Sequence, residues 1–370
     1  MKILVVYHDA DSIFYETLAL MMQKHPDSEV IVADAGEGAP KRKSIPSALT
    51  TRKIAAIKSK YTKAAIHDLR ALFDAEQPDV IFAPSTSGLS NTLFAINGIF
   101  RTVTGAGHAP AKPAVVGYRG TQARVKRLDP TYRIALINPH VRHLVCETPD
   151  IAALLSEYIP GRKLSVHAKP YDLRWAEKAI ATPVSLQGDG LQISYVGITE
   201  DRPHKGLHHL LEAIRILNGR NIKTHLTVVG QAGKDDIASA PENVTFTGNR
   251  TDALNHIAAS DIFVLPSTRD ASPRVVREAE ACGVPVIVSD IPGARDLVVT
   301  SGAGICGILT EPANPGAIAD AIQRLEADPD LRRKMGENGR RNIAANYRTD
   351  CYAEYFYNLF NSLKDSDAKL

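Results

Sequence analysis

Residues 270–290, DASPRVVREAEACGVPVIVSD, combine acidic side chains with the signals of a short helix. Ser272 suits the N-cap position, and Pro273 suits the first helical position because the missing N–H of proline would be unpaired there anyway. Gly283 suits the C-terminal cap. These signals predict a helix over 273–282.

Two acids stand near the start of this helix. Asp270 lies in the preceding loop, and Glu278 projects from the second turn. Free backbone N–H groups and the positive end of the helix dipole form an anion site suited to phosphate. Carboxylates accept hydrogen bonds from ribose or sugar hydroxyls, each contributing roughly 1.5–3 kcal/mol. A plainer alternative remains open, in which Arg274 and Glu278 form only a surface i,i+4 pair.

The elements that must position these acids are short, apolar, β-branched runs that alternate with helical stretches. This alternation predicts parallel βαβ units. A polar, Gly-rich stretch at about 175–190 divides the runs into two groups, so we predict two open parallel sheets. The runs are KILVVY, EVIVAD, PDVIFAPS, PAVVGYRG and HLVCET in the first group, and LQISYVGI, THLTVVG, NVTFTG, DIFVLPS and GVPVIVSD in the second.

The predicted fold class is therefore α/β, with two Rossmann-like domains. A chain of 370 residues is too long for one ordinary core. Ligands of open parallel sheets bind outside the carboxyl ends of the strands, and a cleft between two such domains is a common ligand site. We expect the last stretch, about 317–364, to form helices with breaks at Pro329 and Gly339.

Composition excludes several classes of protein. The hydrophobic and charged fractions, 44% and 23%, are ordinary for a globular protein. The formal net charge of +3 is too small to indicate a nucleic-acid partner, and we expect none. The four cysteines match no metal spacing, and no metal site is expected. No apolar run suits a signal peptide or a membrane span, so we expect a cytoplasmic protein.

The pattern PS-x2-D-x7-EA-x3-G-x-PV resembles the E-x7-E signature of retaining GT-B glycosyltransferases of family 4, the glycosyl transferases group 1. Further pieces follow in the order that is typical of this family, and the resemblance covers about 190–350. They are VGITEDRPHKG, LTVVG, NVTFTG, DIFVLPS, SDIPGARDLV, GILTEPANPGAIADAI and LRRKMGENGR.

The resemblance implies a GT-B fold with two Rossmann-like domains facing across a cleft. We expect an N-terminal acceptor domain over 1–183, a nucleotide-sugar-binding domain over 184–350, and a C-terminal helix over 351–370 that crosses back to the first domain. The implied reaction is retaining transfer of a hexosyl group from a nucleoside-diphosphate sugar to a glycan or lipid-linked acceptor. Cell-envelope polysaccharide or lipopolysaccharide synthesis is the expected setting.

By the same resemblance, Glu278 binds the nucleotide ribose. Asp270 touches the donor sugar and is one methylene shorter than the family's usual glutamate. Ala271, Ser272 and Pro273 replace the family's Gly-aromatic-Gly.

Because proline has no N–H to donate, the phosphate and sugar contacts are expected to shift to the backbone amides of Ser272, Arg274 or Val275. Lys205, at a helix start, matches the lysine that holds the diphosphate. Its plainer interpretation is a solvated surface lysine.

The family's usual arginine directly after Gly197 is missing, and Ile198 stands there. Arg202 or His204 is expected to supply the charge, and we place Arg202 in the catalytic set with the lysine and the first acid. Gly197 and Gly248, each at the end of a strand motif, complete the donor-binding set. With these charges and the helix N-terminus available, no divalent metal or other cofactor is expected.

The acceptor side is harder to predict. The family often places a histidine after a middle strand, but this chain has Tyr118 and Arg119 there. Asp9-Ala10-Asp11 spells the metal-binding Asp-x-Asp of the other glycosyltransferase fold, which carries that pair deep in its single domain. We therefore interpret it as a polar loop at a strand end, with Asp9 as an acceptor-side candidate.

Residues 41–63, KRKSIPSALTTRKIAAIKSKYTK, contain eight Lys or Arg residues and no acid. This stretch is either a solvated helix or loop, or a patch that makes peripheral contact with anionic lipid or an anionic acceptor, at about 1 kcal/mol per basic residue near a charged membrane.

Two alternatives to a transferase remain open. One is a GT-B sugar-nucleotide epimerase. The other is a non-catalytic nucleotide-sugar-binding or scaffold protein, which the replacements around the signature favour.

Overall fold

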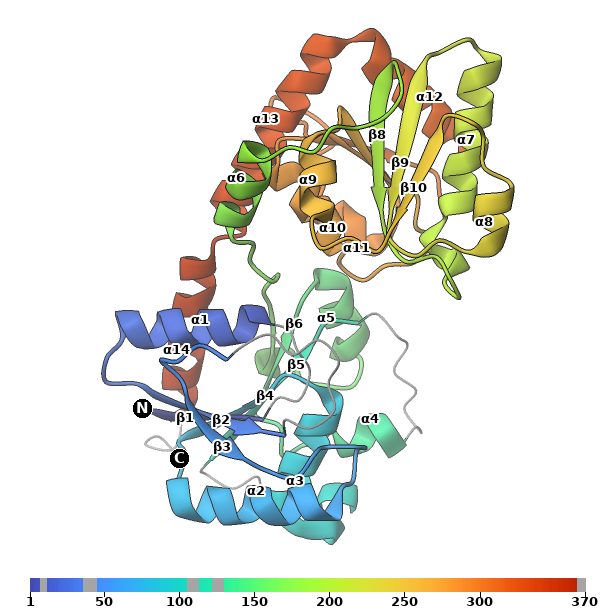
Figure 1. Cartoon of the computed structure of the whole chain (residues 1–370). Coiled ribbons are helices and arrows are strands. Elements are labelled where there is room, and N and C mark those ends of the chain that lie inside the picture. The colour runs from blue at the N-terminus through green and yellow to red at the C-terminus, as the bar shows by residue number, and fades with distance from the viewer. Residues whose placement is uncertain (7–11, 36–44, 105–112, 122–129, 365–370) are drawn as a thin grey trace. The chain divides into compact units, whose positions relative to one another are not determined.

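The computed structural model describes residues 1–6, 12–35, 45–104, 113–121 and 130–364 (Figure 1). These residues form two compact units, one containing 1–170 and 349–370 and the other containing 171–348. Each unit is built on its own parallel sheet, which confirms the predicted α/β class with two Rossmann-like domains.

The sheet of the first unit has seven parallel strands in the order β3-β2-β1-β4-β5-β6-β7. Both of its faces are covered by helices, which is why its central strands are continuous apolar runs. The strands are β1 (Lys2–Val6), β2 (Glu29–Asp34), β3 (Thr50–Lys53), β4 (Val80–Ala83), β5 (Ala114–Arg119), β6 (His143–Cys146) and β7 (Leu164–Val166).

Alternate residues of β1 enter two different cores. Leu4 and Val6 pack on the face that α2 and α3 cover, whereas Ile3 and Val5 pack on the face that α1 and α14 cover. Helices α1 and α14 lie side by side (Figure 1), so the C-terminal helix belongs to this unit, as the resemblance implies. The helices are α1 (Ser12–Lys24), α2 (Lys63–Glu76), α3 (Thr86–Thr104), α4 (Pro130–Ile134), α5 (Pro149–Ser156) and α14 (Thr349–Lys364).

The sheet of the second unit has six parallel strands in the order β10-β9-β8-β11-β12-β13. Because β8 pairs with both β9 and β11, the strand order reverses between β8 and β11, and ligands of such sheets bind at that switch point. The strands are β8 (Leu191–Val196), β9 (Thr224–Val229), β10 (Val244–Gly248), β11 (Ile262–Leu265), β12 (Val286–Ser289) and β13 (Gly307–Thr310).

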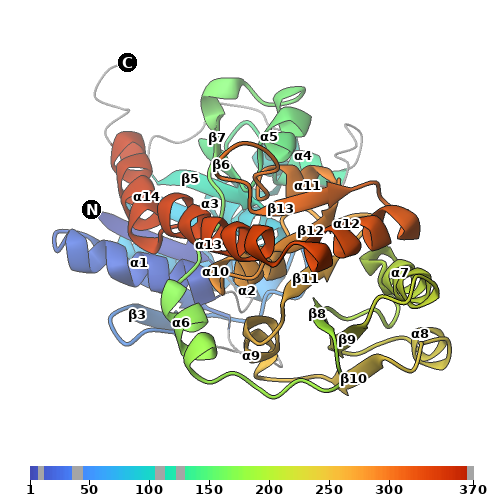
Figure 2. The same ribbon diagram turned by 90° about the horizontal axis from the view of Figure 1, so that it is seen from above.

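Helices also cover this second sheet, and α7 packs against α12 (Figure 2). The helices are α6 (Leu173–Ala181), α7 (Leu207–Gly219), α8 (Lys234–Ala238), α9 (Ala253–Ala258), α10 (Arg274–Ala281), α11 (Pro292–Arg295), α12 (Pro315–Ala327) and α13 (Pro329–Asn346). No helix in the described part of the chain is both long and apolar enough to cross a membrane.

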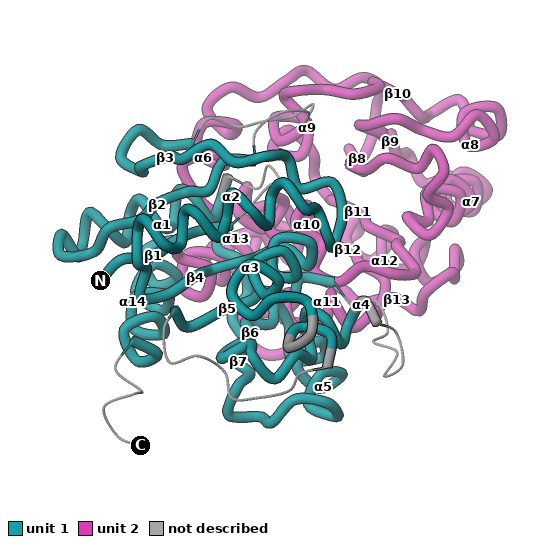
Figure 3. Tube along the Cα trace, turned by 90° about the horizontal axis from the view of Figure 1, so that it is seen from below, with its two compact units in different colours: residues 1–170, 349–370 teal, residues 171–348 magenta. Residues whose placement is uncertain are grey.

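The two units divide at 170/171 and at 348/349 (Figure 3), earlier in the chain than the expected boundaries at 183/184 and 350/351. The first boundary moves because the stretch that looks aperiodic in the sequence contains α6. This helix packs against α9 and α10 and therefore belongs to the second unit.

The expected helix break at Gly339 is wrong, because α13 runs through it without interruption. A Cβ at Gly339 would lie 3.2 Å from the Cβ of Glu280, so the glycine lets α13 approach α10 closely. The break at Pro329 is present, as the proline begins α13.

Glu280 is a fully buried acid at this α10–α13 contact, and the sequence pattern gave no sign of it. The Cys306 Sγ donates to its Oε1 at 3.2 Å, and the Asn342 Nδ2 donates to its Oε2 at 3.1 Å. Burial raises the pKa of Glu280 from its usual value to about 7, because desolvation penalises the charged form.

We predict that Glu280→Gln changes the pH dependence of stability. The folded chain holds the Glu280 proton more tightly than the unfolded chain, so the stabilisation is present at acidic pH and is lost as the pH rises towards and through about 7. Between pH 5.5 and 8.5 the wild type should lose about 2 kcal/mol of unfolding free energy relative to the variant. Urea denaturation at several pH values measures this difference.

The exposed Glu326 on α12 provides the control, because Glu326→Gln should leave the pH profile parallel to that of the wild type. A pH-independent difference between Glu280→Gln and the wild type would contradict the prediction.

Candidate functional site

Helix α10 carries the predicted acids, but it begins one residue later than expected. Pro273 occupies the N-cap position, and Ser272 does not cap the helix. The Ser272 hydroxyl is buried and makes no hydrogen bond within the described residues. The prediction of Ser272 as N-cap and Pro273 as first helical residue is therefore wrong, because proline takes an extended ψ of 105° here.

The end of α10 is as predicted. Gly283 has a φ of 76°, which glycine adopts without steric cost. The Gly283 N–H donates to the Glu280 carbonyl and the Val284 N–H donates to the Ala279 carbonyl, the paired bonds of a Schellman motif. Within α10, Val276 is fully buried, whereas Val275 is only half-buried.

Two loops meet at the switch point of the second sheet, after β8 and after β11. The Thr268 N–H donates to the His204 carbonyl at 2.8 Å, which joins the loops directly. Gly206 has a φ of 74° and faces the Pro266 carbonyl so closely that a Cβ would collide with it. The start of α11 supports the second loop, because a Cβ on Gly293 would collide with the Asp270 and Ala271 carbonyls.

This arrangement brings two predicted catalytic residues together. The Lys205 Nζ donates to the Asp270 Oδ2 at 2.6 Å, although the residues are 65 positions apart. Their side chains retain 23% and 17% exposure, so the pair is accessible but partly desolvated. The interpretation of Lys205 as a free surface lysine is wrong. Asp270 stands in the loop that leads into α10, whose amino end favours an anion.

Two further cations lie in the same loops. Arg202 and Arg269 are both exposed, in the loops that carry Lys205 and Asp270. The pKa of His204 lies below its usual value because of partial burial, with added repulsion from Arg269 and then Lys205. Both causes favour the neutral imidazole, so Arg202 and Arg269 are stronger candidates than His204 for the extra charge. Arg269, which stands just before the first acid, was missed in the sequence.

Glu278 pairs with Arg274, as the plainer sequence alternative suggested. The Arg274 Nε lies 2.9 Å from the Glu278 Oε1, and the Glu278 side chain is 18% exposed. The Arg274 guanidinium also stacks over the ring of Trp175 in α6, at 5.4 Å from Cζ to the ring centroid. Arg274 therefore orients Glu278, whose side chain is still partly exposed.

The two predicted donor-site glycines lie at the carboxyl ends of their strands, on the same edge of the sheet. The Gly197 N–H donates to the Val229 carbonyl at 2.9 Å, and the Gly230 N–H donates to the Gly248 carbonyl at 2.8 Å. A Cβ on Gly230 would collide with the Gly197 carbonyl, so this edge requires close backbone packing.

The acceptor-side candidates belong to the first unit. Tyr118 and Arg119 end β5 and are both buried. Lys169 lies over the Tyr118 ring, with its Nζ 5.5 Å from the centroid. Glu147 packs over Gly120, where a Cβ would meet its carboxylate. Neither Lys169 nor Glu147 belongs to a motif that is visible in the sequence. Asp9 lies outside the described residues.

No group of three or more His, Cys, Asp or Glu side chains within the described ranges could hold a metal ion.

Comparison with known proteins identifies a family whose model matches most of the second unit. The family model of the glycosyl transferases group 1 matches residues 186–342. The chain is 29% identical over 194 residues to the capsular polysaccharide biosynthesis glycosyltransferase CapM of Staphylococcus aureus, covering 50% of each protein. It is 26% identical to the lipopolysaccharide core biosynthesis glycosyltransferase LpsD of Rhizobium meliloti, covering 60% of this chain and 64% of LpsD. The matches thus span about half to two thirds of these relatives' length.

Solved structures show the same fold over nearly the whole chain. The crystal structure of Anabaena HepE in complex with UDP superposes with a TM-score of 0.73 at 16% identity, covering 98% of this chain and 100% of HepE. At that identity the likeness establishes the fold alone. The chain therefore has the GT-B fold, and its residues 186–342 match the family model of the glycosyl transferases group 1.

Proposed function

We propose that this protein transfers a glycosyl group from a nucleoside-diphosphate sugar to a glycan or lipid-linked acceptor of the cell envelope, with retention at the anomeric carbon. The observation that carries the proposal is the Lys205–Asp270 pair before the amino end of α10, with Glu278 one helical turn further along. A nucleoside-diphosphate sugar is a diphosphate with a sugar on either side. The cation and the helix N-terminus suit the diphosphate, and the two carboxylates suit the hydroxyls of the two sugars.

The names of the relatives support this proposal. CapM and LpsD are named for capsular polysaccharide and lipopolysaccharide core biosynthesis. The structures of HepE contain UDP or UDP-glucose. None of these names indicates an epimerase or a scaffold, so the two alternatives from the sequence are not favoured.

In the proposed mechanism, Lys205 and the α10 amides take the negative charge that grows on the leaving diphosphate, with Arg202 and Arg269 as supporting cations. Asp270 accepts hydrogen bonds from sugar hydroxyls, and Glu278 accepts them from the ribose. The proposal needs no divalent metal, because the protein's own charges offset those of the donor. Asp270 holds Lys205 until a diphosphate replaces it as the counter-ion.

We predict that Lys205→Ala lowers the rate of nucleoside-diphosphate release by about 10²–10³-fold, the usual effect of removing one group that stabilises transition-state charge. A thermal-shift screen of UDP-, GDP- and ADP-sugars first identifies the donor, because binding raises the melting temperature. Turnover is then measured with and without EDTA, which should have no effect. NMR of the product's anomeric carbon tests retention.

Lys223→Ala is the matched control, because Lys223 is an exposed lysine of the same unit far along the chain from the two loops. Arg202→Ala and Arg269→Ala should each give a smaller loss. Unchanged turnover of Lys205→Ala, in a protein that melts normally, would refute the proposed role of this lysine.

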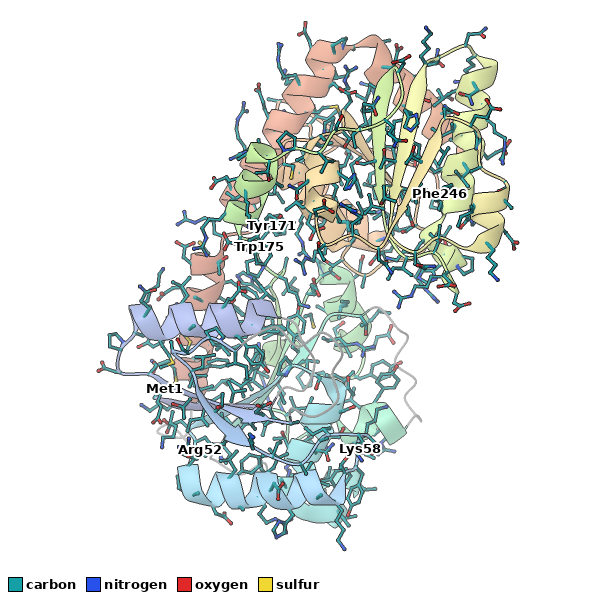
Figure 4. All side chains as sticks on the ribbon, viewed as in Figure 1. Met1, Arg52, Lys58, Tyr171, Trp175 and Phe246 are labelled. Carbon is teal, nitrogen blue, oxygen red and sulfur yellow. The ribbon has the colours of Figure 1, made fainter. Side chains whose placement is uncertain are left out.

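We also propose that the acceptor lies at an anionic membrane, which the first unit contacts through Lys58, Lys60 and Lys63. No ion pair is found for these three lysines within the described residues. Figure 4 shows Lys58 at the surface of this unit. Residues 41–44 of the basic stretch lie outside the described residues, and 50–53 form β3.

The loop that carries these lysines is fixed on α3. Asn91, which is fully buried, accepts from the Thr62 N–H at 2.9 Å and donates to the Ser59 carbonyl at 2.8 Å. The Tyr61 ring packs edge-on against Phe94 at 4.9 Å and is still 46% exposed. An exposed aromatic ring between lysines is suited to the interface of an anionic bilayer.

Helix α3 is kinked, and the part after the kink exposes further apolar side chains on the first unit. Gly98 interrupts the helix with a φ of 71°, and the Arg70 Nε donates to the Ala95 carbonyl at 3.1 Å. Beyond the kink, Ile99 and Val103 are four residues apart and remain 59% and 49% exposed. They extend the apolar surface of this unit.

We predict that replacing Lys58, Lys60 and Lys63 with glutamate lowers binding to vesicles that contain phosphatidylglycerol by about a hundredfold or more, at about 1 kcal/mol per lysine. Flotation with and without anionic lipid measures it. Lys234→Glu combined with Ile237→Ser, both on the exposed surface of α8, is the control. If the wild type does not float with either kind of vesicle, the proposed membrane contact is wrong. The proposed donor chemistry is not affected by that result.

A further inference from the structure

A cavity of about 190 Å³ lies in the first unit at the amino ends of β6 and β7. Its wall comes from residues 136–144, which lead into β6, and from residues 158–163, which lead into β7. Tyr118 and Arg119, in contrast, end β5 at the carboxyl edge of the same sheet. Because ligands of open parallel sheets react at the carboxyl edge, this cavity is separate from the acceptor-side candidates.

The interior of the cavity is largely apolar. The polar Asn138 is engaged elsewhere, because its Nδ2 donates to the Thr102 and Ile134 carbonyls at 2.8 and 3.2 Å. The His143 Nε2 shares a hydrogen bond of 2.7 Å with the Ser165 hydroxyl. A dry cavity of roughly 150 Å³ holds a benzene molecule, so this one has room for roughly six to eight carbon atoms of a chain. Its apolar lining includes Leu136, Ile137, Val141, Leu144, Tyr158 and Ile159.

Lys163 brings a charge to the wall of this cavity. Its Nζ donates to the Pro139 carbonyl at 3.1 Å and to the Val141 carbonyl at 3.3 Å, and both of these residues also line the cavity. The ammonium is therefore held beside the apolar interior. Since an ammonium has three N–H donors, one remains for a ligand.

The surroundings of Lys163 carry an excess of positive charge. Burial lowers the pKa of Lys163, and repulsion by Arg142 and then Arg162 lowers it further. Neither Lys163 nor the exposed Arg162 forms an ion pair with an acid within the described residues. A phosphate group bound here would offset this repulsion and would accept charge-assisted hydrogen bonds.

The wall of the cavity adjoins the apolar end of α3. Asn138 joins the two through its bond to the carbonyl of Thr102, which directly precedes Val103. Ile99 and Val103 are exposed and belong to the apolar surface of the proposed membrane contact. A ligand with both an apolar chain and a phosphate is available at such a surface, since phospholipids have this chemistry.

We propose that the cavity binds part of one acyl chain of an anionic membrane phospholipid, with the lipid phosphate against Lys163 and Arg162. The bound lipid is not the acceptor, because the cavity lies at the opposite edge of the sheet from the acceptor-side candidates. The inference rests on the proposed membrane contact only for the source of the lipid, and it does not depend on the proposed donor chemistry.

The test is calorimetric titration of the full chain with ligands kept below the concentration at which they form micelles. Octyl phosphate has the chain and the phosphate, octanol has only the chain, and inorganic phosphate has only the head. Octyl phosphate should bind about tenfold more tightly than octanol, as expected for one charged hydrogen bond, and also more tightly than inorganic phosphate. From butyl to octyl phosphate, the affinity should rise about fourfold per methylene group until the cavity is full. Dioctanoyl phosphatidylglycerol should compete with octyl phosphate.

Two variants separate the contribution of the head from that of the chain. Lys163→Met keeps an unbranched side chain and removes the ammonium, so it should weaken octyl phosphate about tenfold and change octanol little. Ile137→Phe fills part of the cavity and should weaken both ligands. Lys53→Met and Ile237→Phe, at exposed positions on β3 and α8, are the matched controls and should leave both affinities unchanged. Should Ile137→Phe fail to fold, the series of chain lengths still tests the cavity.

Several results would overturn the inference. Octyl phosphate would then bind no more tightly than octanol, or would bind Lys163→Met as tightly as the wild type. An affinity that does not increase with chain length, or a lack of competition by dioctanoyl phosphatidylglycerol, would also overturn it. If Lys205→Ala weakens octyl phosphate and Lys163→Met does not, the ligand is bound at the proposed diphosphate site instead. Titration in solution needs no vesicle, so failure of this lipid site is distinguished from failure of the proposed membrane contact.

Discussion

The contact between the Lys205 ammonium and the Asp270 carboxylate, 2.6 Å apart, is the interaction on which the rest of the site depends. It forms because strands β8 and β11 are neighbours and the loops after them are joined by the bond from Thr268 to His204. Gly206 permits the close approach of the two loops. The contact between Lys205 and Asp270 therefore depends on both the order of the strands and the geometry of the two loops. A change in either would separate the two side chains.

This pairing also bears on the electrostatic balance of the candidate site. Exposed helix amides and a partly buried ammonium would otherwise lack a counter-charge, and Asp270 supplies one at close range. A diphosphate carries more negative charge than one carboxylate, so in the proposed mechanism it would compete for Lys205 and release Asp270 to accept sugar hydroxyls. The same carboxylate would then serve the empty site and the loaded site in turn.

The sequence predicts most of the fold because both sheets are parallel and their central strands are buried on both faces, so these strands are largely apolar runs. The polar edge strand β3 carries no such signal. The spacing of Asp270 and Glu278 is likewise visible along one helix. The contact between Lys205 and Asp270 is not visible in the sequence, because these residues are 65 positions apart and their proximity depends on the order of the strands. The extended backbone of Pro273 and the passage of α13 through Gly339 also depend on neighbouring segments, which local helix signals do not include.

Amide hydrogen exchange with and without a nucleoside diphosphate tests the central claim most directly, because it reports on backbone N–H groups at the proposed phosphate site. The account predicts that UDP or GDP slows exchange in two segments, 197–206 and 268–278, while the remaining strands of the second unit change little. Unaltered exchange in both segments under saturating nucleotide, or slowing confined to other parts of the chain, would contradict it.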